Sequence, residues 1–306
     1  MTSKIAKPFL KWAGGKTQLI NEIERSLPFE ITNNKFTYVE PFVGSGAVLF
    51  WMLSKFPNLE KAIINDINAD LINTYNVIAE KPKKIIKELK QLHEKYHLLK
   101  NNETKQLEYY LEKRKLYNTR NENKIMQAAL FIFLNKSCFN GIYRVNSKNE
   151  FNVPKGSSVT PPICDEENIL AVSQALKKVT ILSGDYQNTL DHTSENTFFY
   201  FDPPYKPLSK TSSFNSYTKE NFDDAEQIRL KEFCVKVEQL GHKWMMSNSD
   251  VKGKDNSDDF FDELYAKFKI ERVQAKRSLN AHGDKRGKLS ELLITNYNYE
   301  QALQTA

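Results

Sequence analysis

The stretch FFYFDPPYKP, residues 198–207, decides the fold that we expect for this chain. Four apolar and aromatic residues run directly into Asp202, Pro203, Pro204 and Tyr205. Two consecutive prolines fix φ and remove two backbone donors, so a central strand must end there. The sequence therefore predicts a buried strand that stops at a stiff turn. In open α/β sheets, this carboxyl edge is where ligands bind.

Similar apolar, β-rich runs recur on both sides of this stretch. They cover residues 38–42, 61–66 and 179–183 before it, and 243–248, 268–275 and 291–297 after it. Several are apolar on both faces, as strands buried in a parallel sheet are. Amphipathic helices fit after Gly46 and over residues 223–240. This strand–helix alternation predicts a doubly wound α/β sheet.

The middle of the chain, from about residue 70 to 165, has no convincing core strand. Residues 83–100 place their apolar side chains on one stripe, and residues 123–136 are apolar on most sides, so both segments predict helices. The Gly-, Asn- and Pro-containing segment that follows is typical of a hairpin or an irregular loop. We expect a helical insert, residues 69–165, in an α/β domain formed by residues 1–68 and 166–306.

Bulk properties narrow the class of protein. The net charge of +6 over 306 residues permits a polyanionic partner without requiring one. No apolar run is long enough for a membrane span, and the amino terminus lacks the apolar stretch of a signal peptide. Cys138, Cys164 and Cys234 are odd in number and far apart, which argues against a disulfide framework and favours a reducing cytoplasm.

The segment EPFVGSG, residues 40–46, follows a predicted strand and opens a helix. Glycines there let the backbone approach a ligand and leave helix N–H groups pointing at it. A dinucleotide fingerprint needs a third glycine where the chain has Leu49, so NAD is disfavoured. Asp66 ends the next predicted strand, where a carboxylate can accept hydrogen bonds from two ribose hydroxyls. Together, the glycine segment and Asp66 indicate a binding site for a nucleoside-bearing cofactor rather than a tight turn without a ligand.

Two further segments match known motifs only superficially. WAGGKT, residues 12–17, ends like a P-loop, but the first glycine of that motif would fall on Leu10, and no buried strand precedes it. HEKYH, residues 93–97, matches the zinc-protease signature, but it lies on a lysine-rich helix without an evident third ligand. We therefore exclude a P-loop and predict no metal site.

The turn at Asp202 suits one chemistry in particular. The exocyclic amine of a nucleobase is a poor nucleophile because its lone pair is delocalised into the ring. The Asp202 carboxylate and the Pro203 carbonyl can accept its two N–H bonds and aim the lone pair at an electrophile, while Tyr205 stacks on the base. A sulfonium methyl group beside the glycine turn would be that electrophile. The rate would then come from positioning and electrostatics.

The Asp-Pro-Pro-Tyr turn, the Phe-Val-Gly-Ser-Gly turn and the leading FLKWAGGK together resemble the Dam-type (α-class, D12) DNA adenine N6-methyltransferases. The likeness covers about residues 7–297, in the family's order of cofactor turn, helical insert and catalytic turn. It implies a Rossmann-like fold, S-adenosyl-L-methionine as cofactor, and Asp202, Pro203, Pro204 and Tyr205 as catalytic residues. The cofactor contacts that it implies are Trp12, Ala13, Gly14, Lys16, Glu40, Pro41, Phe42, Gly44, Gly46, Asp66, Ile67, Asp185, Tyr186 and Asp202.

The insert resembles the target-recognition domain of that family, with residues 138–154 as its DNA-reading hairpin. Arg144 stands where the family places an arginine on a guanine, whose O6 and N7 suit the guanidinium fork. Phe139 and Ile142 stand where an aromatic ring and an aliphatic chain probe the duplex, although tyrosine and leucine are commoner there. The implied target is GATC in double-stranded DNA. The implied DNA contacts are Lys11, Phe139, Asn140, Ile142, Arg144, Asn146, Pro154, Lys276 and Arg277.

Two polar segments, after the Asp202 turn and near the carboxyl end, are further candidates for contact with DNA. Residues 206–220 are Ser/Thr-rich and too long for a simple connection, which predicts a mobile lid around the DNA and the flipped base. Residues 275–288 form a basic, glycine-containing segment that we expect to contact phosphates. We expect a monomer or weak dimer in a bacterial or phage-infected cytoplasm, associated with the nucleoid. It would act as an orphan enzyme or beside a cognate restriction endonuclease that it does not contact.

Two alternatives stay open. One is an amino-methyltransferase that acts on another DNA sequence, on RNA or on protein, since such enzymes also use a Pro-Pro-aromatic turn. The aspartate that begins the turn here and the hairpin with Arg144 argue against it. The other is a non-catalytic DNA-binding regulator, against which the intact Asp202, Tyr205 and Asp66 argue.

Overall fold

A computed structural model describes residues 4–12, 14–205, 222–252, 258–276 and 288–299. The predicted lid, residues 206–220, lies outside the described residues. The same holds for Ala13, Arg277, the side chain of Lys276 and most of the basic segment 275–288.

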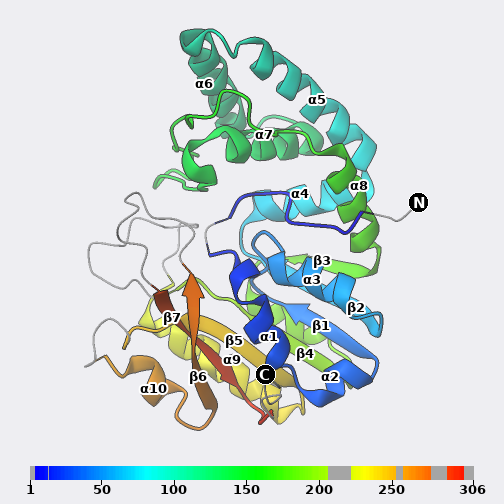
Figure 1. The fold of residues 1–306 in the computed structure, drawn as a ribbon, viewed down its shortest axis with the longest axis vertical. Coiled ribbons are helices and arrows are strands. Elements are labelled where there is room, and N and C mark those ends of the chain that lie inside the picture. The colour runs from blue at the N-terminus through cyan, green and yellow to red at the C-terminus, as the bar shows by residue number, and fades with distance from the viewer. Residues whose placement is uncertain (1–3, 13, 206–221, 253–257, 277–287, 300–306) are drawn as a thin grey trace, which may run out of the picture.

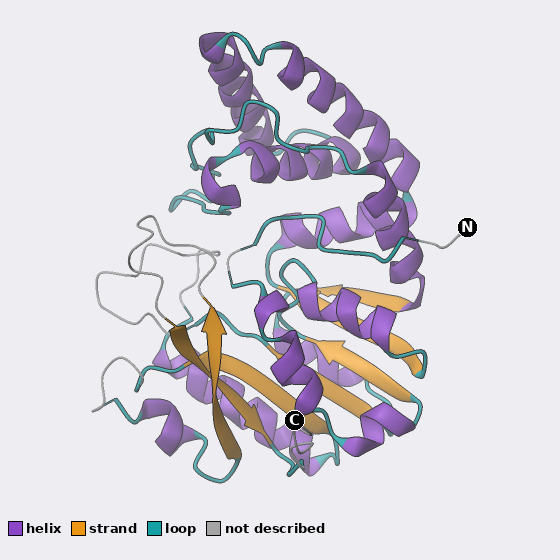
Figure 2. Cartoon of the chain, in the orientation of Figure 1, coloured by secondary structure: helices purple, strands orange, loops and turns teal. Residues whose placement is uncertain are grey.

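A seven-stranded sheet forms the lower half of the molecule (Figures 1 and 2). Its strands are β1 (Phe36–Glu40), β2 (Leu59–Asp66), β3 (Val179–Ser183), β4 (Thr197–Phe201), β5 (Lys243–Ser249), β6 (Lys269–Lys276) and β7 (Lys288–Thr295). Their order in the sheet is β3-β2-β1-β4-β5-β7-β6. The first five of these pair in parallel, whereas β7 runs antiparallel to both of its neighbours. All seven predicted strands and the Rossmann-like methyltransferase fold are thereby confirmed.

Strand β4 shows why these segments are apolar on both faces. Phe198 and Tyr200 enter the hydrophobic core on one side of the sheet, and Phe199 and Phe201 enter the core on the other side. The first side is covered by α1 (Ile20–Arg25), α2 (Phe29–Asn33) and α3 (Ala47–Lys55), and the second by α9 (Asp224–Gln239) and α10 (Phe260–Leu264). Each fully buried aromatic side chain contributes about 1.5–3 kcal/mol, so both layers hold β4 in place.

The chain between β2 and β3 is helical and forms the upper half of the molecule (Figure 1). The helices are α4 (Ala69–Glu80), α5 (Pro82–Leu98), α6 (Glu103–Thr119), α7 (Lys124–Ser137) and α8 (Glu166–Ala175). Residues 128–134 of α7 are fully buried, and α4, α5 and α6 pack around them. Helices α5 and α7 confirm the two predicted there. Short 3-10 turns complete the structure: η1 (Lys16–Gln18), η2 (Phe139–Gly141), η3 (Leu176–Lys178) and η4 (Tyr186–His192).

No helix in the described part of the chain combines the length and the apolar character that crossing a membrane requires.

Candidate active site and nucleic-acid interface

The carboxyl ends of β1, β2 and β4 bring three predicted segments to one edge of the sheet. β1 lies between β2 and β4, and the chain reverses its direction of winding between β1 and β4. Such a switch point opens a crevice at the carboxyl ends of the strands. The glycine turn follows β1, Asp66 ends β2, and the Asp202 turn follows β4. The topology therefore assembles the candidate cofactor and catalytic residues.

The glycine turn requires its glycines at two positions. Gly44 and Gly46 have φ values of 48° and 75°, in the left-handed region that favours glycine. A Cβ on Gly44 would lie 3.1 Å from the indole of Trp12, and one on Gly46 would lie 2.6 Å from Oη of Tyr75. The indole of Trp12, from the leading WAGGKT segment, therefore lies directly against this turn.

Asp66 holds the glycine turn through its carboxylate. Oδ2 accepts the amide of Gly44 at 3.1 Å, and Oδ1 accepts the amide of Asn68 at 2.9 Å. Burial raises the pKa of Asp66 to about 6, against the opposing effect of these backbone donors. At the end of β1, Glu40 is buried and accepts the hydroxyl of Tyr38 at 2.9 Å. Burial likewise raises the pKa of Glu40 well above its usual range.

Residues 184–186, which follow β3, lie beside the end of β2. Gly184 is bound to the end of β2, because its amide donates to the carbonyl of Asp66 at 3.1 Å. The Tyr186 ring lies 5.1 Å from the ring of Phe42, and its hydroxyl is buried without a hydrogen-bond partner in the described part of the chain. Asp185 forms an ion pair with Arg229 of α9, whose guanidinium lies 5.0 Å from the Tyr186 ring. Arg229 was not among the predicted site residues.

The turn at Asp202 is joined to the leading WAGGKT segment by an ion pair. Nζ of Lys16 lies 2.9 Å from Oδ1 of Asp202, donates to the carbonyl of Gly14 at 2.8 Å, and lies 4.3 Å from the Tyr205 ring. Oδ1 of Asp202 also accepts the hydroxyl of Ser247 at 3.1 Å. Burial raises the pKa of Asp202, while the ammonium of Lys16 opposes that shift. Lys16, predicted as a cofactor contact, therefore also touches Asp202, the first residue of the predicted catalytic turn.

The turn at Asp202 is also held by hydrogen bonds with three residues that sequence analysis did not single out. Glu291 of β7 accepts the hydroxyl of Tyr205 at 2.7 Å. Gln227 of α9, fully buried, donates to the carbonyl of Pro204 at 3.2 Å, and Ser247 of β5 is the donor to Asp202 described above. Ser247 and Glu291 are polar residues in otherwise apolar strands, which is their only sequence signal, and Gln227 lies in a helix rich in charged residues and has none.

Residues 138–154 form an irregular hairpin, as predicted. An isolated bridge joins Val145 to Phe151, and the turn between them is closed by Asn146, whose Oδ1 accepts the amide of Glu150 at 2.9 Å. Nε of Arg144 donates to Oδ1 of Asn152 at 2.8 Å, and Nη2 donates to its carbonyl at 3.4 Å. These two bonds fix the plane of the guanidinium.

The predicted DNA contacts differ in how they are placed. Lys11 is exposed, and a Cβ on Gly141 would lie 2.5 Å from its side chain, so Lys11 lies beside the hairpin. Phe139 is 49% exposed, which is unusual for so large an apolar side chain. Asn140 is exposed, and Ile142 is half-buried. Asn146 and Pro154 also take part in the hairpin's own structure, because the Pro154 carbonyl accepts the amide of Phe139 at 2.9 Å.

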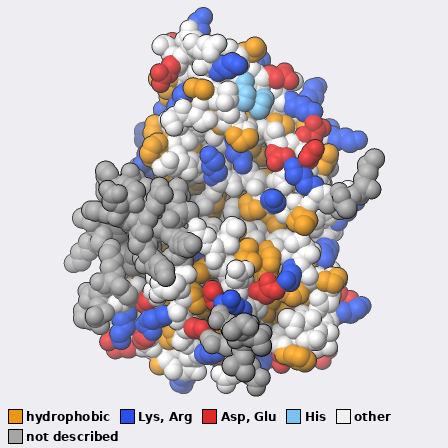
Figure 3. Space-filling model, in the orientation of Figure 1, with side chains coloured by type: hydrophobic (Ala, Val, Ile, Leu, Met, Phe, Trp, Pro, Cys, Tyr) orange, Lys and Arg blue, Asp and Glu red, His pale blue; other side chains and the backbone are white. Residues whose placement is uncertain are grey.

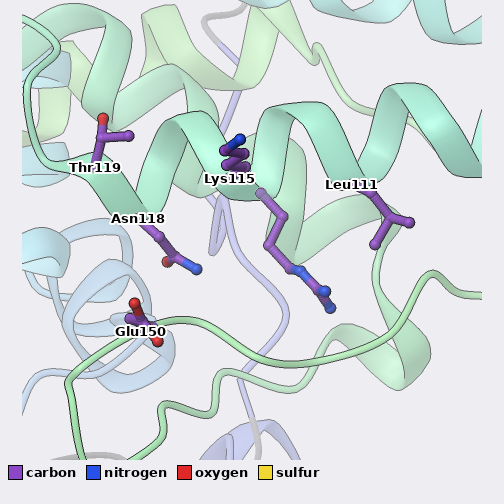
Figure 4. Close-up of a pocket in the computed structure, with 6 residues that line it drawn as sticks. Leu111, Lys115, Asn118, Thr119 and Glu150 are labelled. Carbon is purple, nitrogen blue, oxygen red and sulfur yellow. The ribbon is translucent and has the colours of Figure 1, made fainter.

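Helix α6 supports the hairpin from outside. The side chain of Asn118 bonds both the amide and the carbonyl of Phe151, at 2.9 and 3.0 Å, while Tyr110 and Arg114 donate to the carbonyl of Val153. A pocket beside these contacts is lined by α6 and by Glu150 of the facing turn (Figure 4). On the face seen in Figure 3, Lys and Arg side chains are spread over the helical half.

Among the described residues, no group of three or more His, Cys, Asp or Glu side chains could hold a metal ion. In the HEKYH segment of α5, the rings of His93 and His97 lie 3.9 Å apart, and Nε2 of His97 lies 2.9 Å from the carbonyl oxygen of Pro161.

Comparison with known proteins decides the family. Residues 12–279 match the family described as D12 class N6 adenine-specific DNA methyltransferase. The chain belongs to this family. The predicted resemblance is thus confirmed, and DNA adenine methylation is the activity of this methyltransferase.

Three curated relatives match the methyltransferase over almost its whole length. It is 48% identical over 296 residues to the type II methyltransferase M.MjaIII of Methanocaldococcus jannaschii, covering 95% of this chain and 99% of that protein. It is 37% identical to the type II methyltransferase M1.LlaDCHI of Lactococcus lactis subsp. cremoris, with 95% of each chain covered. It is 33% identical to a DNA adenine methylase of Haemophilus influenzae, covering 94% of this chain and 92% of that protein.

Proposed function

We propose that the methyltransferase transfers a methyl group from S-adenosylmethionine to N6 of an adenine flipped out of duplex DNA within GATC. The observation that supports this most directly is the contact between Lys16 and Asp202, at 2.9 Å. It places the acid that would receive the adenine amine next to the segment that packs on the glycine turn. In this proposal, the sites for the methyl donor and for the adenine therefore lie at one edge of the sheet.

The residues at this edge fit S-adenosylmethionine. The turn at Gly44 has no room for a side chain beside Trp12, the Asp66 carboxylate lies at the end of β2, and the buried Tyr186 hydroxyl lacks a partner in the described part of the chain. Asp66 would hold the ribose hydroxyls, and Phe42 and Tyr186 would flank the adenine of the cofactor. When bound, the cofactor supplies a methyl group activated by its sulfonium sulfur.

The chain's own residues would make the target amine reactive. The Asp202 carboxylate and the Pro203 carbonyl accept its two N–H bonds, which directs the lone pair out of the ring plane. The negative charge of Asp202 also stabilises the positive charge that grows on this nitrogen. Tyr205, fixed by Glu291 at 2.7 Å, offers its ring to the flipped base. These contacts position the base and lower the barrier electrostatically.

For target choice, we assign residues 69–165 as the recognition domain and the hairpin as its reading element. Arg144 would bond O6 and N7 of the guanine, and Lys11 would contact the outer base pair. The exposed Phe139 would fill the space that the flipped adenine leaves. The enzyme would serve either as the methyltransferase of a restriction–modification system or as an orphan methylase, because relatives of both names resemble it.

Methyl transfer to defined DNA tests this function. The enzyme is incubated with S-adenosylmethionine and unmethylated duplex DNA, and modified positions are identified by sequencing. We expect N6-methyladenine in every GATC and none in a duplex from which GATC has been removed. Methylation confined to another sequence would refute GATC, and a complete lack of transfer would refute the proposed chemistry.

The raised pKa of Asp66 predicts a pH dependence of cofactor binding. The ionised carboxylate is the better acceptor for ribose hydroxyls, and a pKa of about 6 means that protonation begins well above the usual range of an aspartate. Affinity for S-adenosylhomocysteine should therefore be constant above about pH 7 and fall as the pH drops through 6. In Asp66→Asn, binding should be weaker by about tenfold and insensitive to pH in this window. Calorimetric titration of both proteins between pH 5 and pH 8 measures this, and a wild-type affinity that stays constant to pH 5 contradicts it.

A further inference from the structure

Arg120 occupies an unusual position at the end of α6. It is the first residue after the helix and has a φ of 58°, in the left-handed region that a residue with a side chain adopts at a cost of roughly 1–2 kcal/mol. Glycine or asparagine is the common choice at such a helix end.

The guanidinium of Arg120 reaches three separate parts of the molecule. Nη1 lies 2.6 Å from Oδ2 of Asp70 in the first turn of α4, and Nη2 donates to the carbonyl of Asn149 at 3.3 Å. Cζ of Arg120 lies 4.2 Å from the ring centroid of Tyr117, whose hydroxyl donates to the same Asp70 oxygen at 2.8 Å. Arg120 thus joins the start of α4, helix α6 and the hairpin turn.

Each end of this junction leads to a different ligand site. On one side, the amide of Asp70 donates to Oδ1 of Asn68 at 3.1 Å, and the amide of Asn68 donates to Asp66 at 2.9 Å. On the other side, the amide of Asn149 donates to the carbonyl of Asn146 at 2.9 Å, in the turn of the hairpin that carries Arg144. One side chain therefore lies between the ribose-binding carboxylate and the DNA-reading hairpin.

The hairpin touches the cofactor side at a second point. Tyr143, next to Arg144, stacks on Trp12 with ring centroids 5.7 Å apart and planes 16° apart, and Trp12 packs on Gly44. The hairpin therefore contacts the cofactor side of the molecule at two separate places, through Arg120 and through the stack of Tyr143 on Trp12.

We infer that Arg120 is a positioning residue that couples cofactor binding to DNA binding by linking the Asp66–Asp70 loop to the hairpin. This inference rests on the proposed sites for S-adenosylmethionine and DNA. The coupling is reciprocal, so the bound cofactor strengthens DNA binding by the same factor by which bound DNA strengthens cofactor binding.

Binding of each ligand with and without the other tests the inference. Affinity for a GATC duplex is measured with and without S-adenosylhomocysteine, and affinity for S-adenosylhomocysteine with and without the duplex. In the wild type we expect both ratios to be equal, at about tenfold, within the usual range of allosteric coupling. In Arg120→Gln both ratios should fall to about twofold or less, while the affinity for each ligand alone changes by less than about threefold.

A second variant and a control keep the result interpretable. Asp70→Asn breaks the same ion pair from the other side, and the double variant should show no further loss if both residues act through one contact. Arg25→Gln removes an exposed ion pair with Glu22 on α1 and should keep the wild-type ratio. Wild-type coupling in folded Arg120→Gln and Asp70→Asn, or no coupling in the wild type, overturns the inference. A wild type that binds neither ligand refutes the proposed function instead.

Discussion

Replacing Asp202 by alanine should reduce methyl transfer by about 10²- to 10³-fold, since a preorganised electrostatic contact to the reacting group contributes a factor of this size. The substitution removes the acceptor that would hold the adenine amine and the negative charge that stabilises it. Binding of S-adenosylhomocysteine should remain, because Asp66, Gly44 and Tyr186 are untouched. Single-turnover methylation of a GATC duplex with saturating cofactor measures the loss at the chemical step.

Asp202→Ala also removes the ion pair with Lys16, so a second variant is needed to separate the loss of activity from a loss of stability. The Lys16 side chain is only 5% exposed, so without Asp202 its charge loses its partner in a buried site, which costs stability. Asp202→Asn keeps the side-chain volume and a carbonyl oxygen that can still accept from Ser247 and Lys16. We expect it to be more stable than the alanine variant and still slowed by about 10²-fold, because the charge is gone. Turnover within tenfold of the wild type in a folded, cofactor-binding alanine variant would disprove the catalytic assignment.

The sheet was predictable because its strands carry unusually direct signals. Residues 198–201 must be buried on both faces, and the two prolines after them fix where β4 ends. Gly44, Gly46 and Asp66 were likewise readable, because a left-handed turn and a carboxylate at a strand end are local properties. The sequence contains no such signal for α6, whose apolar side chains follow no single stripe. Its buried face is held by Tyr110, Tyr117 and Gln106.

Contacts between residues far apart in the chain could not be predicted from the sequence. The whole helical insert lies between Lys16 and Asp202 in the chain, and their contact depends on β1 and β4 being neighbours in the sheet. The contact between Glu291 and Tyr205 also depends on the strand order. β7, which carries Glu291, lies between β5 and β6 rather than at the edge of the sheet. Polar residues in apolar strands can be noticed in a sequence, but their partners follow from topology.

The second large effect concerns the choice of target, where Arg144→Ala should lower discrimination against duplexes altered at the guanine of GATC. A bidentate arginine–guanine contact contributes about 1–3 kcal/mol, which corresponds to about 5–150-fold. A contact of this kind needs an oriented guanidinium, and Arg144 donates to Oδ1 of Asn152 at 2.8 Å and to the Asn152 carbonyl at 3.4 Å, which together fix its plane. The enzyme is given GATC in competition with each of three duplexes in which the guanine is replaced by A, C or T. The ratio of kcat/KM values measures the loss.

Two variants separate reading of the base from attraction to the DNA. Arg144→Lys keeps the positive charge but not the planar fork, so it should retain affinity and salt dependence while losing discrimination almost as fully as alanine. Asn152→Ala removes the bond from Nε of Arg144 to the side chain and keeps the bond from Nη2 to the backbone carbonyl. The guanidinium plane is then held by one bond instead of two, so a smaller loss in the same direction is expected. Unchanged discrimination in Arg144→Ala would mean that the guanine is read by another residue. If the lysine variant kept full discrimination, charge alone would suffice, and the fork geometry held by Asn152 would have no role in reading the sequence.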